Sequence, residues 1–162
     1  MLFLTGCGTI NVPMYSTATI GNSWERIGLT EFEGYSIDKF DGENVSYEDI
    51  NKHKAIFHIL VGEHKLIIRS VFKQSSKGYC PCPAYNELIF NAEKGKRYKL
   101  TGKVKGKTSY VWIIDVDTEE RKSKVSCSNY GNLKVRKGYS SWLQYAKSRK
   151  FQNIGSSNCK IP

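Results

Sequence analysis

Five cysteines and three histidines of this 162-residue chain could supply thiolate and imidazole groups to a metal site or to catalysis. Thiolate and imidazole groups are ligands that zinc and copper accept. The two closest cysteines have the spacing Cys-x-Cys, which differs from the Cys-x₂-Cys of zinc knuckles, so we expect neither a metal site nor a cofactor. The candidate ligands for such a site are His53, His58, His64, Cys80 and Cys82.

Catalytic groups have little support in the sequence. A cysteine nucleophile needs a lowered pKa and a neighbouring base, and disulfide formation explains Cys80 and Cys82 with fewer assumptions. Asp115 and Asp117 could work as paired carboxylates, but the end of a strand before a turn is the more common context. The glycines and lysines of residues 102–107 lack the spacing of a phosphate-binding loop. We therefore do not expect an enzyme.

The N-terminal residues Leu4–Cys7 read Leu-Thr-Gly-Cys and resemble the lipobox of bacterial lipoproteins. The resemblance implies cleavage after Gly6 and acylation of Cys7, which would anchor the chain in a bilayer. Only Leu2–Leu4 are apolar ahead of the cysteine, whereas a signal peptide needs basic residues and about 7–15 apolar ones. Either the true start lies upstream of Met1, or the segment is not exported and Cys7 is a small core residue of a strand.

Lipidation of Cys7 would leave four cysteines, an even number that suits an oxidising compartment. A bond between Cys80 and Cys82 would close a very tight ring across a single proline. We therefore favour bonds that join Cys80 and Cys82 to Cys127 and Cys159, in either order. One disulfide with two free thiols is the alternative.

The positive charge of the chain is concentrated at its C-terminal end. Residues 121–162 contain ten Lys and Arg and no Asp or Glu, which equals the net charge of +10 of the whole chain. Tyr and Trp residues alternate with these cations, a mixture typical of contact with anionic lipid headgroups or single-stranded nucleic acid. The alternative is that the aromatic residues pack the segment onto the body of the protein. The expected contact residues are Lys134, Arg136, Lys137, Trp142, Tyr145, Lys147, Arg149 and Lys150.

The middle of the chain has the pattern of short strands separated by turns. Apolar or alternating runs occupy residues 35–40, 55–61, 65–72 and 109–116, and Asp41-Gly42 is a strong hairpin signal. Turns recur about every ten residues, which indicates a sandwich. We predict an all-β fold, an antiparallel β-sandwich of about seven strands with a short helical or irregular C-terminal tail.

Three parts are expected along the chain. Residues 1–22 would be a truncated signal, lipobox and tether or loose first strand, residues 23–120 the sandwich, and residues 121–162 a basic appendage. Within the appendage we expect a loop over residues 126–138 and a short helix over residues 140–150.

Four turn and strand motifs follow one another across about half of the chain. They are Asp41-Gly42, Gly62-Glu63-His64, the segment Phe90–Tyr98 with its Gly-x-x-Tyr, and Ile113-Ile-Asp115. In order and spacing they are similar to a group of small bacterial lipoproteins of unassigned function. The resemblance implies an immunoglobulin-like or prealbumin-like sandwich and brings no catalytic residues.

The sequence thus predicts a bacterial envelope lipoprotein, anchored through acylated Cys7 at the periplasmic face of the outer membrane. Its expected role is that of a structural or binding module whose basic tail contacts an anionic envelope polymer or lipid. Nucleic acid is not the expected partner. The alternatives are a cytosolic nucleic-acid-binding protein that uses the same tail, and a thiol or metal enzyme.

Overall fold

The computed structural model describes residues 17–26, 31–46, 55–74, 83–130 and 154–161, and within them the chain is all-β. Eleven strands form in these residues, which confirms the predicted fold class but exceeds the expected number of strands. None of the described residues forms a helix that could cross a membrane. The strands are β1 (Thr17–Gly21), β2 (Ser23–Arg26), β3 (Glu31–Phe40), β4 (Glu43–Asn44), β5 (Ile56–Leu60), β6 (Gly62–Gln74), β7 (Ala84–Ala92), β8 (Arg97–Lys105), β9 (Thr108–Asp115), β10 (Ser126–Asn129) and β11 (Ile154–Ser157).

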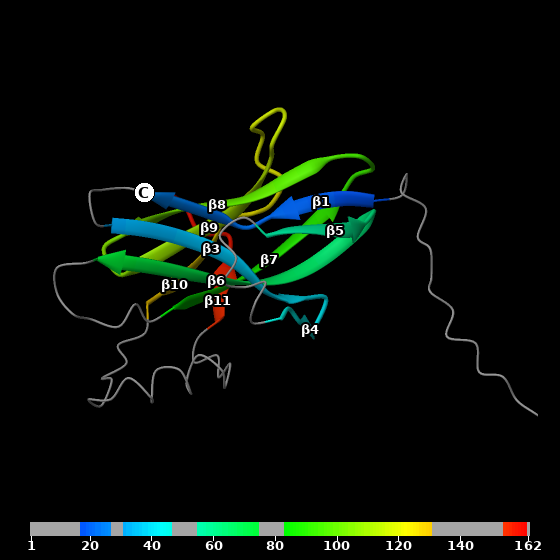
Figure 1. The fold of residues 1–162 in the computed structure, drawn as a ribbon. Helices are drawn as coiled ribbons and strands as arrows, with labels where there is room; N and C mark the ends of the chain where they lie inside the picture. Colours follow the sequence, from blue (N-terminus) through cyan, green and yellow to red (C-terminus); the bar gives the residue numbers. More distant parts are fainter. Residues whose placement is uncertain (1–16, 27–30, 47–54, 75–82, 131–153, 162) are drawn as a thin grey trace, which may run out of the picture.

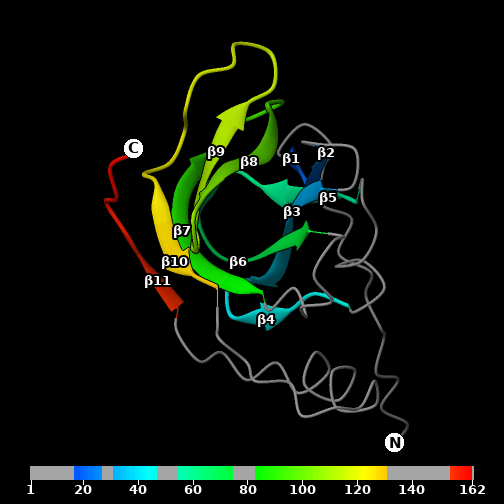
Figure 2. The same ribbon diagram turned by 90° about the vertical axis from the view of Figure 1, so that its left-hand side faces the viewer.

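Two sheets face each other and share one strand (Figures 1 and 2). The first contains β2, β3, β6 and β7 in that order, with β4 paired to β3, and the second contains β10, β9, β8, β1 and β5. Strand β11 lies between β7 and β10 and pairs with both, so the hydrogen-bonded ladder continues from one sheet into the other.

The sheets are mixed, so the predicted antiparallel pairing holds for most strand pairs but is wrong for two of them. Strand β1 runs parallel to β8, and β11 runs parallel to β7, while the other pairs are antiparallel. Both parallel pairs join strands that are distant in sequence, whereas the turn signals report only on hairpins between neighbours.

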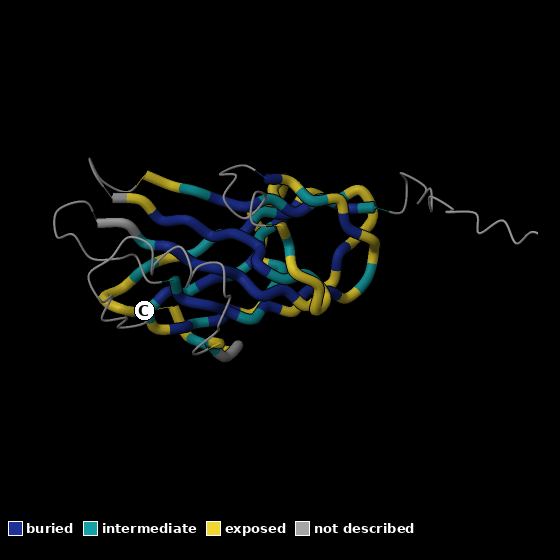
Figure 3. Tube along the Cα trace, turned by 60° about the horizontal axis from the view of Figure 1, so that its bottom comes forward, coloured by how far each residue is buried: buried dark blue, intermediate teal, exposed yellow. Residues whose placement is uncertain are grey.

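The apolar core is built from buried side chains of both sheets. Figure 3 shows the buried residues in dark blue along the central parts of the strands. Along β9 the inward side chains of Val111 and Ile113 are fully buried, while Tyr110 and Trp112 point outward and are half-buried. Each fully buried Leu, Ile or Val stabilises the fold by about 1.5–3 kcal/mol relative to an exposed one. The larger side chains of the core are Ile20, Tyr35, Ile37, Ile59, Leu66, Ile68, Leu88, Phe90, Tyr98, Leu100 and Ile113.

The strand assembly extends beyond residues 23–120 on both sides. Residues 17–21 form β1, residues 126–129 form β10 within the expected loop, and residues 154–157 form β11 within the expected irregular tail. The inward side chains of β10 are Ser126 and Ser128, which are small and polar and give no hydrophobic alternation in the sequence. The expected helix over residues 140–150 lies outside the described residues.

Candidate anionic-surface interface

Most of the predicted site residues lie outside the described part of the chain. This applies to the lipobox cysteine, two disulfide candidates and all eight expected contact residues, namely Cys7, Cys80, Cys82, Lys134, Arg136, Lys137, Trp142, Tyr145, Lys147, Arg149 and Lys150. The structure does fix where the segment with the eight contact residues begins and ends. Because it connects β10 to β11, it is bounded by the sheets on both sides and is not a free appendage.

The cations at the start of β8 are neutralised by carboxylates. Lys96 Nζ lies 3.1 Å from Asp115 Oδ2, and Arg97 pairs with Asp117. The backbone N–H of Asp117 and the Lys96 ammonium lower the pKa of the buried Asp115 carboxyl, so it stays ionised beside its partner. This end of the strand therefore presents little net charge.

The cations at the other end of β8 have no such partners. Lys103, Lys105 and Lys107 are exposed around the β8–β9 hairpin, where the positive φ of Gly106 permits a tight turn. Among the residues that the structure describes, no carboxylate lies within ion-pair distance of these three lysines. We call Lys103, Lys105 and Lys107 the hairpin lysines.

An acidic side chain that approaches the hairpin, Glu33, forms its hydrogen bonds inside the sandwich. Glu33 accepts a hydrogen bond from the backbone N–H of Val104 at 3.2 Å and one from the Tyr35 hydroxyl at 3.0 Å. Burial, together with the Glu33 carboxylate, raises the pKa of Tyr35, so its hydroxyl remains a donor. Glu33 is itself buried, and it forms no ion pair with the hairpin lysines.

The basic C-terminal sequence leaves the body beside this hairpin. The backbone N–H of Tyr130 donates to the carbonyl oxygen of Lys107 at 2.8 Å. The chain continues into residues 131–153, which carry six Lys and Arg and no carboxylate. Sequence reasoning placed the interface in the tail alone, although lysines at positions 103, 105 and 107 were a visible signal of a basic turn.

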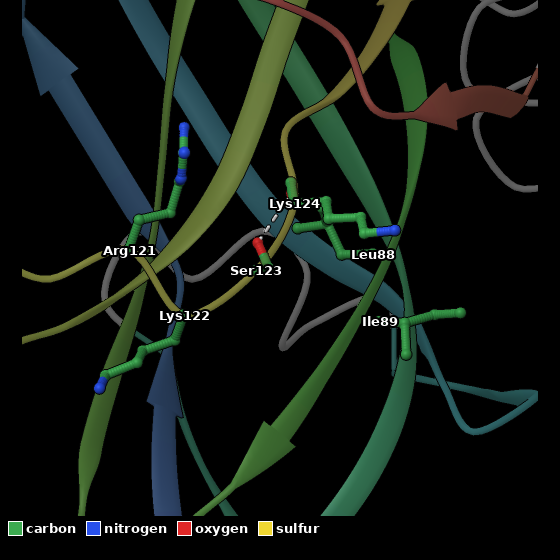
Figure 4. A pocket seen from close by; sticks show the side chains of 6 residues that line it. All are labelled: Leu88, Ile89, Arg121, Lys122, Ser123 and Lys124. Carbon is green, nitrogen blue, oxygen red and sulfur yellow. Dashed lines mark hydrogen bonds between the residues drawn. The ribbon is translucent and has the colours of Figure 1, made fainter.

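A second basic surface surrounds a cavity of about 520 Å³ between β7 and the segment 121–124 (Figure 4). Arg121 and Lys122 extend away from Ser123 in different directions, and Lys122 Nζ lies 3.0 Å from Glu120. The Ser123 hydroxyl accepts from Ile113 N–H at 2.9 Å and donates to the Lys124 carbonyl at 3.0 Å. The cations do not converge on one point, so this surface adds positive charge without forming an anion pocket.

Of the two described histidines, His58 is exposed on β5 and His64 has a structural setting. His64 is buried beside Phe40, and its ring nitrogens lie 2.7 Å from Asp41 Oδ2 and 2.7 Å from the Leu60 carbonyl oxygen. Partial burial raises the pKa of Asp41, but the hydrogen bonds from Lys65 N–H and His64 outweigh it and lower that pKa. No three His, Cys, Asp or Glu side chains in the described ranges are placed to hold a metal ion.

Cys127 and Cys159 form a disulfide, with Cα atoms 5.9 Å apart. The favoured pairing of these residues with Cys80 and Cys82 is therefore wrong. Strands β10 and β11 run antiparallel with Cys127 opposite Ser156, and the N–H of Cys159 donates to Val125 O at 3.0 Å. Strand pairing that the sequence did not reveal brings the two cysteines together.

No protein-family model, curated protein sequence or solved structure matches the chain.

Proposed function

We propose that the protein is a lipid-anchored module of the bacterial envelope that binds an anionic surface through its basic C-terminal region. In this proposal Cys7 carries the acyl chains and the body faces the periplasm from the outer membrane. Each buried methylene contributes about 0.8 kcal/mol, so two or more chains give stable attachment. The sheets would then be of immunoglobulin-like or prealbumin-like type.

The observation that supports binding most directly is the position of the hairpin lysines. They lie beside Tyr130, where the chain continues into residues 131–153 with their six further cations. The second cationic segment of the sequence thus begins beside the hairpin, and positive charge without internal partners favours anionic ligands. The disulfide supports an oxidising compartment, because such bonds are rare in the cytosol.

Anchoring is tested by intact mass spectrometry of the protein extracted from its native membrane. We expect a chain without Met1–Gly6 and with lipid mass on Cys7, and a Cys7→Ala variant that is recovered without lipid. An unmodified Met1 in the native protein would exclude the anchor.

Binding is tested separately by cosedimentation of the full-length protein with vesicles of zwitterionic lipid, with and without added phosphatidylglycerol, and with insoluble cell-wall polymer. We expect binding to one of the anionic materials that weakens as salt rises. Replacing Lys134, Arg136 and Lys137 by Gln should weaken it several-fold. A cytosolic nucleic-acid-binding protein would instead have reduced cysteines in cells and a preference for oligonucleotides that falls steeply with salt.

A further inference from the structure

The outer face of the β8–β9 hairpin combines the hairpin lysines with aromatic side chains. Tyr110 lies opposite Lys103 in the strand register, and Trp112 lies opposite Thr101. Both aromatic side chains point outward, because the inward positions of β9 are taken by core residues. Two residues along a strand are separated by about 6.8 Å, so the two rings form a short row beside the lysines.

This face carries a strong local charge. No Asp or Glu occurs between Leu100 and Ile114, and the lysines are held on a regular hairpin rather than on a loop. A fixed row of cations next to aromatic rings suits a linear polyanion whose backbone offers both charged groups and flat apolar surfaces.

The location of the face separates it from the proposed anchor. Strand β1 is parallel to β8, and Gly95 N–H donates to Thr17 O at 3.0 Å, so the chain enters the body beside the start of β8. The nine residues of β8 span about 30 Å, which places the hairpin at the opposite end of the sheet. Figure 1 shows β1 beginning at the right-hand end of the body. In a molecule anchored through Cys7, the hairpin is the end remote from the tether.

The disulfide distinguishes between two classes of polyanion. Cys127 is opposite Tyr110 in the register of β10 and β9, so the bond lies at the margin of this face. Disulfides persist outside the cytosol, where anionic glycans are more accessible than nucleic acid.

We propose that the outer face of the β8–β9 hairpin binds a linear anionic glycan. The hairpin lysines contact its carboxylate, phosphate or sulfate groups, and Tyr110 and Trp112 pack against the apolar faces of its sugar rings. The inference rests on the proposed function for the compartment and deepens it by naming the partner. It assigns the contact to a polymer beyond the membrane rather than to the anchoring lipids.

The experiment places the acylated full-length protein in phosphatidylcholine vesicles and measures binding of fluorescent alginate, dextran sulfate and neutral dextran. We expect both anionic glycans to bind and neutral dextran not to bind. The triple variant Lys103→Gln/Lys105→Gln/Lys107→Gln should bind about tenfold more weakly or worse, because each lysine near a polyanion contributes a few-fold. Lys94→Gln removes an exposed lysine at the other end of β8 and should change binding less than about twofold.

The aromatic contribution is tested by Trp112→Ala, with Trp112→Phe as the variant that keeps an aromatic face. Thermal melting checks that each variant is folded. We expect weaker glycan binding in the first variant and substantial recovery in the second, since stacking needs a ring rather than the indole N–H.

Three results would overturn the inference. They are an unchanged affinity in the triple lysine variant, tighter binding of a single-stranded oligonucleotide than of alginate at equal charge, and preferential binding to added phosphatidylglycerol vesicles. Failure of the proposed anchor is seen independently, because a protein without acylated Cys7 does not remain with the phosphatidylcholine vesicles. In that case, binding of the same three fluorescent glycans is measured with the full-length protein free in solution.

Discussion

The disulfide between Cys127 and Cys159 should account for a large part of the stability of this protein. The bond closes a loop with a sequence separation of 32 residues. In the chain-entropy description, closing a loop of this length destabilises the unfolded state by about 3.7 kcal/mol at 25 °C. Single domains are stable by about 5–15 kcal/mol in total, so the variant Cys127→Ser/Cys159→Ser should fold but be markedly weaker.

Urea unfolding of the full-length protein measures this loss. We expect the double variant to have a lower midpoint and an equal or larger slope, because the unfolded chain without the bond is less restricted and exposes more surface to urea. Hydrogen exchange adds a local measurement, because the bond holds β11 against β10. The amides of β11 should lose protection first, while those of β9 follow the global unfolding.

The reasoning would be refuted by a loss of less than about 1 kcal/mol together with unchanged protection in β11. Such a result would mean that backbone pairing alone fixes the C-terminal strand. A fall in slope would instead point to a change in the unfolded ensemble.

Three further predictions test other parts of the structure. Leu88→Ala should cost about 2–5 kcal/mol in urea unfolding because its side chain is fully buried, whereas Ile89→Ala, at the exposed neighbouring position, should cost about 0.5 kcal/mol or less. Gly155→Ala should detach β11 and lower the urea midpoint, because its Cβ would lie 2.0 Å from a carbonyl oxygen of β10; Gly21→Ala, where the nearest atom is 3.8 Å away, is the tolerated control. Because the folded protein lowers the pKa of Asp41, its stabilising effect should be complete above the ordinary value of 3.8 and be lost as pH falls through the lowered pKa. In urea unfolding at several pH values, Asp41→Asn should reduce the loss of unfolding free energy at acidic pH. An unchanged loss would contradict the role of the Asp41 carboxylate.

The sequence predicts best those features that depend on neighbouring residues. Residues 109–116 have the clearest strand pattern, and β9 alternates inward and outward side chains as that pattern requires. Asp41-Gly42 forms the turn between β3 and β4 with positive φ at both residues. These features are local, since the alternation and the turn chemistry are both contained within a few residues.

Features that depend on distant pairing were missed. The inward Ser126 of β10 gives no apolar signal, and β11 is stabilised by β7 and β10, which are far away in sequence. The predicted disulfide pairing was wrong for the same reason, because the observed bond depends on the position of β11. For the interface, the sequence gives the position of each cation along the chain but not which cations have carboxylate partners. Only the ion pairs at the start of β8 reveal that the hairpin lysines differ from the other cations of that strand.

The position of β11 also changes how the basic segment could work. Residues 131–153 are held at Tyr130 on one side and at Ile154 on the other, and the disulfide encloses them within one covalent loop. No residue of a 23-residue segment held at both ends lies more than about 12 residues from an anchored end, a reach of about 40 Å when fully extended. Its six cations therefore belong to a segment tethered to the body at both ends, and tethering raises the effective concentration of a second binding site. A polyanion that contacts both this segment and the hairpin lysines would bind bivalently, so breaking the disulfide should weaken binding even if every lysine is retained. That coupling follows from the topology and would not exist for a free C-terminal tail.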